Sequence, residues 1–203
     1  MVYLQVLVNG LTLGALYACL AVGFSLVWGV LNVINMLHGS LIVLGGYLTY
    51  FAWQQWQLHP LVSLLPVSAL IFLLGWALQA GLVNRLVRQP VLTTLTVTFG
   101  LDLVLYTTPR RVTLDMGTLA VGDVIVAWDR VLAFALALSL TGLLYFVMRS
   151  SRAGRAIVAV RMDRDAAALM GIRIHRVYAI TFAIGAGLAG ACGALMAMVF
   201  PVT

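Results

Sequence analysis

Long runs of apolar residues, separated by short polar stretches, make up most of this chain of 203 residues. A run of about 20 apolar residues spans a bilayer as a helix. We expect six such crossings, at about residues 4–30, 38–57, 61–84, 91–108, 129–148 and 177–200. Backbone groups inside a bilayer need partners within the chain, which favours helices. The pattern therefore predicts an all-α, polytopic transmembrane helix bundle that forms a single domain, residues 1–203.

The composition agrees with a membrane protein and excludes several chemistries. Apolar residues make up 63% of the chain and charged residues 9%, more apolar surface than a soluble domain of this length needs. A nucleotide-binding P-loop requires a lysine and the chain has none, so we expect no ATP hydrolysis by this chain. Cys19 and Cys192 are isolated, and His38 has no second ligand at metal-binding spacing. We therefore expect neither a metal nor a cofactor.

The arginines predict the orientation of the bundle. The loop at residues 149–176 holds seven of the twelve basic residues: Arg149, Arg152, Arg155, Arg161, Arg164, Arg173 and Arg176. Basic loops stay on the cytoplasmic side, so we expect this loop and a second one at Arg85 and Arg88 to be cytoplasmic. The N-terminus and residues 109–128 are then expected outside. Anionic lipid headgroups account for the net charge of +6 without a nucleic-acid partner.

Polar residues interrupt the apolar pattern at residues 29–39, GVLNVINMLHG. Asn32, Asn35 and His38 are spaced by three, and Gly39 follows. Polar groups at membrane depth must be hydrogen-bonded or face a cavity. Two interpretations remain open. These four residues line a transport route in a discontinuous segment, or they form hydrogen bonds between helices that only fix the bundle.

Asp102 stands out because an acidic side chain inside a membrane segment is a candidate for function. It lies near the outer end of its run, and we favour a shallow position where the outer loop hydrates it. Its role stays open.

Small residues predict close helix packing at two places in the chain. Gly10 and Gly14 have GxxxG spacing in the first run. Ala183, Gly187 and Ala191 share one face of the last run. Such faces let membrane helices approach closely. The GxGxxG spelling at residues 185–190 lies in an apolar run without a preceding strand, so it indicates packing and not dinucleotide binding.

The basic loop contains the pattern of a compact helix. Asp163 is placed to cap the first turn, and Asp165 adds negative charge near the helix's positive end. Gly171 stands where a left-handed C-terminal cap is expected. One face at i, i+3, i+4 spacing carries small and apolar side chains: Ala166, Leu169 and Met170.

Two segments resemble a known family. Asp165, Ala166 and Ala167, followed by Gly171, resemble the EAA-x-x-x-G coupling motif of ABC-importer permeases, with Asp in place of Glu. Residues 9–50 resemble the opening of the branched-chain amino-acid permeases, and residues 151–156 resemble their lead-in to the coupling motif. The opening includes an I-N-x-x-H-G signature: Ile34, Asn35, His38 and Gly39. The resemblance covers nearly the whole chain and is weakest in the middle third.

The resemblance implies the permease subunit of a bacterial ABC importer that moves branched-chain amino acids inward across the inner membrane. Expected partners are ATPase subunits, a second related permease and a periplasmic substrate-binding protein. The ATPase would dock on a helix at residues 163–171, and the coupling residues are Asp165, Ala166, Ala167, Leu169, Met170 and Gly171.

Alternatives to that function remain open. Relatives of the family move urea, amides or other amino acids. An autonomous channel or secondary transporter is a further alternative, although such proteins need charges at membrane depth and the sequence offers only Asp102.

The resembled proteins continue beyond the position of Thr203, so we expect a fragment-like C-terminus. An incomplete bundle would leave the Ala183, Gly187 and Ala191 face without partner helices.

Overall fold

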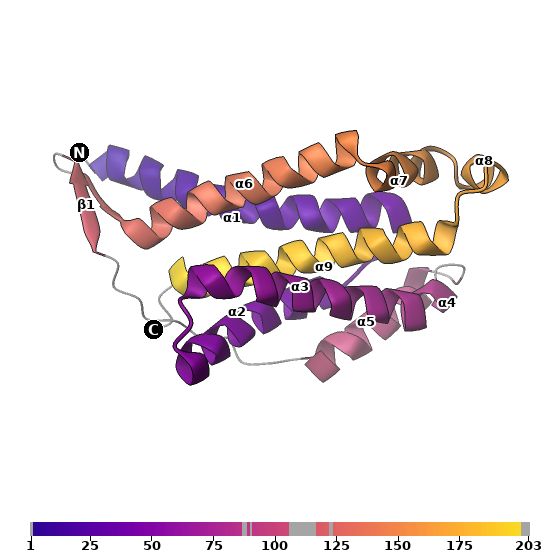
Figure 1. Ribbon diagram of the computed structural model, residues 1–203, viewed down its shortest axis with the longest axis horizontal. Helices are drawn as coiled ribbons and strands as arrows, with labels where there is room; N and C mark the ends of the chain where they lie inside the picture. The colour runs from indigo at the N-terminus through magenta and orange to yellow at the C-terminus, as the bar shows by residue number, and fades with distance from the viewer. Residues whose placement is uncertain (1, 87–88, 90, 106–116, 122–123, 200–203) are drawn as a thin grey trace.

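The computed structural model describes residues 2–86, 89, 91–105, 117–121 and 124–199. Within them, six helices longer than the others run back and forth between two ends of an elongated bundle (Figure 1): α1 (Val2–Leu31), α2 (Leu37–Trp56), α3 (Pro60–Leu78), α5 (Val91–Leu105), α6 (Trp128–Ser150) and α9 (Ile174–Val199). A π-helical turn, η1 (Gln79–Val83), and the short α4 (Asn84–Leu86) extend α3. Two helices, α7 (Arg152–Met162) and α8 (Arg164–Leu169), lie between α6 and α9.

The predicted helix bundle is confirmed, and a polytopic membrane protein fits it. In the described residues, four helices are long and apolar enough to cross a membrane: Tyr3–Leu31, Pro60–Val83, Trp128–Ser150 and Ile174–Val199. Two of the six predicted crossings fall short of that standard. The helix α2 carries many polar side chains, and α5 has only 15 residues in the described part of the chain.

A short β-hairpin departs from the all-α prediction. The strands β1 (Thr118–Val121) and β2 (Val124–Ala127) pair antiparallel, with Thr118 opposite Ala127. The second strand has the sequence VIVA, and β-branched residues favour extended backbone. The hairpin lies in the loop predicted to be outside, so the bundle itself is all-α as predicted.

The small residues of α9 put this helix at the centre of the bundle. It contacts α1, α2, α3 and α6, and most of its side chains are buried. A Cβ atom on Gly193 would overlap the carbonyl oxygen of Ile42, so the backbones of α2 and α9 nearly touch. On another face, Gly187 lies against Phe72 of α3. Glycine permits these approaches because it has no side chain in the contact.

Two packing predictions fail in opposite directions. Ala183, Gly187 and Ala191 are buried, so the expectation that this face lacks partner helices is wrong. Gly10 and Gly14 lie at the other extreme, because a Cβ at either position would meet no described atom within 4 Å. Their GxxxG face is therefore unpacked in the described part of the chain.

The two ends of the bundle differ in character. The helices α4, α7 and α8 lie at one end, so Arg85 and the predicted basic loop come together there (Figure 1). The start of α1 and the strand β1 lie at the opposite end. The two loops predicted to share one side of the membrane thus lie at the same end of the bundle, and the N-terminal helix start lies at the other. Arg88 and residues 106–116 of the predicted outer loop lie outside the described residues.

Candidate functional site

A partly buried break between α1 and α2 confirms the interruption predicted at residues 29–39. The helix α1 ends at Leu31, residues 32–36 are not helical, and α2 begins at Leu37. Asn32 has a left-handed backbone with φ of 52°, a conformation that Asn tolerates better than most residues. Thr98 of α5 donates its hydroxyl to the carbonyl oxygen of Ile34 at 3.1 Å. The break is thus held inside the bundle by a neighbouring helix.

One side of the break forms an open pocket of about 350 Å³, which we call the histidine pocket. Its lining residues are Leu20, Ala21, Phe24, Asn35, Met36, His38 and Gly39. Asn35 is 3% exposed, and its Oδ1 has no hydrogen-bond partner in the described chain. Neither nitrogen of His38 makes a hydrogen bond of ordinary geometry there, although the Leu20 backbone lies within reach of the ring. An unmatched buried polar group costs about 1–3 kcal/mol, and these atoms lie beneath a pocket surface that is mostly apolar.

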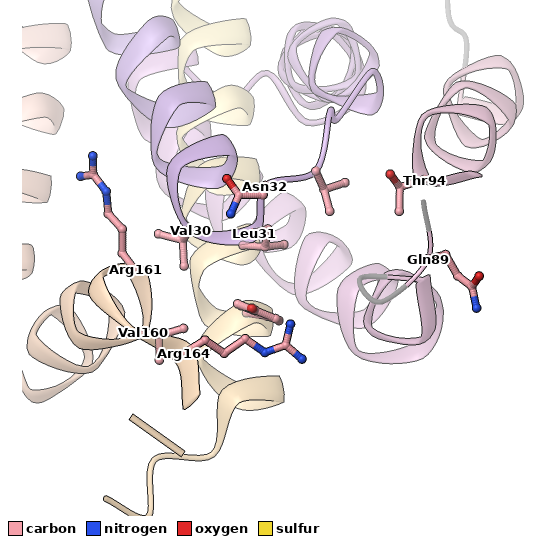
Figure 2. A pocket seen from close by; sticks show the side chains of 10 residues that line it. Val30, Leu31, Asn32, Gln89, Thr94, Val160, Arg161 and Arg164 are labelled. Atoms are coloured by element: carbon pink, nitrogen blue, oxygen red, sulfur yellow. The ribbon is translucent and has the colours of Figure 1, made fainter. Parts of the chain in front are cut away.

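The other side of the break borders a second pocket of about 320 Å³, which we call the arginine pocket (Figure 2). Its lining residues are Val30, Leu31, Asn32, Val33, Gln89, Thr94, Val160, Arg161, Arg164 and Tyr178. The side chain of Arg164 extends into the space between α8 and the Gln89 and Thr94 wall. Arg161 extends along α1 instead, where its Nε would lie 3.8 Å from a Cβ on Gly29.

The break therefore separates the four candidate pathway residues into two groups. Asn35, His38 and Gly39 line the histidine pocket, and Asn32 lines the arginine pocket. A spacing of three residues places side chains on one face only if the segment is helical. Residues 32–36 are not helical, so Asn32 does not join the other three.

The compact helix in the basic loop has both predicted caps. Asp163 accepts hydrogen bonds from the backbone N–H groups of Asp165 and Ala166, each at 2.9 Å. At the other end Gly171 has φ of 83°, and its N–H donates to the carbonyl of Ala168 at 3.0 Å. The N–H of the next residue donates to the carbonyl of Ala167 at 3.1 Å, which completes a Schellman cap. These bonds close both ends of the six-residue helix α8.

The exposed face of α8 carries two large apolar side chains. Leu169 is 90% exposed and Met170 is 83% exposed, and Ala166 and Asp165 are also exposed. Ala167 is only 5% exposed and packs in the core of the bundle. Among the six residues predicted to couple the permease to the ATPase, Ala167 therefore packs against the bundle, and its role in coupling stays a prediction.

Asp102 joins two helices. The hydroxyl of Ser40 in α2 donates to Oδ1 of Asp102 at 2.5 Å and contacts the Asp102 carbonyl oxygen at 3.2 Å. Ser40 is buried, and Asp102 is half-buried. The sequence interpretation missed this pair, although Ser40 directly follows the I-N-x-x-H-G signature and is polar.

The sequence interpretation also missed α7. This helix begins at Ser151, whose hydroxyl accepts the N–H of Gly154 at 2.9 Å, and it buries Gly154, Ile157 and Val160. Their spacing of three is a helical signal that was available in the sequence. Among the described residues, no group of three or more His, Cys, Asp or Glu side chains is arranged to hold a metal ion.

Apolar helices around a glycine-rich centre, four of them long enough to cross a membrane, indicate a multi-pass membrane protein. Residues 6–202 match the family described as "Branched-chain amino acid transport system / permease component". The chain belongs to this family, so it is a permease component and not itself catalytic.

Curated relatives are distant but collinear with nearly the whole chain. The chain is 29% identical to the high-affinity branched-chain amino acid transport system permease protein BraD of Pseudomonas aeruginosa. It is 28% identical to the LivH permease proteins of Escherichia coli K12 and Salmonella typhimurium. Each comparison covers 98% of this chain and 72% of the relative. No solved structure matches the chain.

Proposed function

We propose that this chain is the permease subunit of a bacterial ABC importer that moves branched-chain amino acids inward across the inner membrane. The capped helix α8, which presents Leu169 and Met170 at the basic end, is the observation that carries the proposal. The names of the relatives supply the substrate class. In this proposal all six long helices cross the membrane, the loop at 149–176 is cytoplasmic, and the N-terminus is periplasmic.

The helix α8 is the docking element for a cytoplasmic ATPase. Its exposed side chains offer apolar area that a groove on the ATPase would bury. Ala167 fixes α8 to the bundle, and only four residues separate α8 from the start of α9. Because α9 contacts α1, α2, α3 and α6, a displacement of α8 by ATP-driven closure of the ATPases would reach the whole bundle.

The histidine pocket is part of the transport route in this proposal. Asn35 and His38 line this pocket, whose walls are mostly apolar, and Oδ1 of Asn35 lacks a partner in the described chain. An amino acid with an aliphatic side chain offers both kinds of contact. The pocket is open and its walls come only from α1, the break and α2, so a second, related permease would complete the route. A periplasmic binding protein would deliver the substrate.

Uptake into proteoliposomes tests the function. The complete importer, with its ATPases, second permease and binding protein, should accumulate radiolabelled L-leucine only when ATP is supplied. If urea or an aliphatic amide competes with L-leucine for uptake and the branched-chain amino acids do not, the substrate belongs to another class. Uptake by the permeases without the ATPases would show that the protein is a channel or secondary transporter and not part of an ABC importer.

The variant Asn35→Leu tests the route itself. If Asn35 contacts the substrate, L-leucine uptake should fall, while ATPase binding and the melting temperature of the complex stay near those of the wild type. Normal uptake with a lowered melting temperature would remove Asn35 from the route and assign it to helix packing. Uptake and melting temperature are measured on the same preparation.

A further inference from the structure

The arginine pocket contains an arginine whose charge is not neutralised by a described carboxylate. Arg164 is half-buried, and its guanidinium lies 6.0 Å from the centre of the Tyr178 ring. Asp163, next to it, uses its carboxylate to cap α8. Within the described chain no aspartate forms an ion pair with Arg164. A guanidinium held over a buried aromatic ring, and facing a pocket, is arranged to bind an oxyanion.

The walls of the pocket restrict the kind of anion. The apolar part comes from Val30, Leu31, Val33 and Val160, together with the ring of Tyr178. The polar lining residues are Arg161 and Arg164, together with Asn32, Gln89 and Thr94. A small molecule with a carboxylate, a further polar group and an aliphatic part, as an amino acid has, finds a partner for each of these in this mostly polar lining. The pocket also lies across the break from the histidine pocket, because residues of the break line both.

We infer that the arginine pocket binds the carboxylate of an aliphatic amino acid at the cytoplasmic end of the transport route, with Arg164 as the contacting cation. This inference rests on the proposed function. Arg164 is the first residue of α8, and its neighbour Asp163 forms the N-cap of that helix. A ligand on Arg164 therefore acts directly on α8, the helix that meets the ATPase in the proposed function. Amino acid that accumulates in the cytoplasm slows further import by binding here.

Binding is measured on the importer complex without its periplasmic binding protein, in nanodiscs of phosphatidylcholine. The probe is radiolabelled L-leucine, with leucinamide as the competitor that lacks a carboxylate. Arg164→Gln should weaken L-leucine binding about tenfold or more, because a charge-assisted pair is lost. Arg173→Gln is the matched control. It removes the same charge from an exposed arginine of the same loop that does not line the pocket, and it should leave the affinity unchanged.

A second variant keeps the test decisive if Arg164→Gln does not fold. Asn32→Gly permits the left-handed backbone and removes the side chain with its amide, and it should weaken L-leucine binding about threefold or more. In proteoliposomes preloaded with L-leucine, either variant should restore ATP-dependent uptake that the preload suppresses in the wild type.

Several results would overturn the inference. Equal binding of L-leucine by the wild type and by both variants would do so, as would equally effective competition by leucinamide. Addition of phosphatidylglycerol to the nanodiscs should not displace L-leucine, and displacement would show that the pocket holds a lipid phosphate instead. Absence of ATP-dependent uptake by the wild type would contradict the proposed function. Normal uptake with unchanged binding in the variants would contradict this inference alone.

Discussion

Truncation of Leu169 to alanine should weaken docking of the ATPase without weakening the bundle. The side chain is 90% exposed, so the permease gains almost nothing from it when it folds. If the ATPase buries this side chain, Leu169→Ala removes contacts worth about 2 kcal/mol, at about 0.8 kcal/mol for each buried methylene equivalent. That loss corresponds to a roughly thirtyfold weaker affinity between permease and ATPase.

The affinity is measured by titrating the ATPase onto the permease complex in nanodiscs, and the melting temperature of the permease is recorded in parallel. Leu65→Ala is the matched control, because Leu65 is 72% exposed but lies on α3 within a candidate membrane span. The control should bind the ATPase with wild-type affinity. An unchanged affinity in Leu169→Ala, with both melting temperatures unchanged, would show that the face of α8 is not buried by the ATPase.

Three further predictions follow from backbone geometry and topology. Gly193→Ala should lower the melting temperature by separating α2 from α9, at a cost of about 1–3 kcal/mol, while Gly14→Ala, with open space around it, should not. Gly171→Val should weaken ATPase binding while the bundle stays folded, because a β-branched residue disfavours the φ of 83° by about 1 kcal/mol or more. A wild-type affinity of this variant for the ATPase would contradict the prediction. A cysteine replacing Met162 should react with a membrane-impermeant thiol reagent only once the cytoplasmic face is exposed, and one replacing Thr118 should react in intact spheroplasts. The reverse labelling pattern would invert the orientation.

Features that depend on near neighbours in the sequence were predictable. Apolar runs gave the helices, and the caps of α8 followed from Asp163 and Gly171, because each cap is completed by backbone groups a few residues away. The direction in which α8 faces was not predictable in this way. A helix of six residues has little more than one turn, so its sequence does not determine that Ala167 faces the core and Leu169 faces outward.

The candidate pathway residues show a different limit. The spacing of Asn32, Asn35 and His38 suggested a common face, but this argument assumes helical backbone. The left-handed conformation of Asn32 and the hydrogen bond from Thr98 to Ile34 hold the segment in another shape. The hydrogen bond depends on contact with a helix more than 60 positions away in the chain, which local periodicity does not contain.

The position of α9 in the chain determines when α1, α2 and α3 meet their common partner during synthesis. Chains emerge N-terminal end first, and α9 follows the other five long helices in chain order. Until it enters the membrane, α1, α2 and α3 lack the helix that they all contact. The faces of these helices that pack against α9 have no protein partner at that stage. Insertion of α9 is therefore the step at which these three helices gain the packing partner that they share.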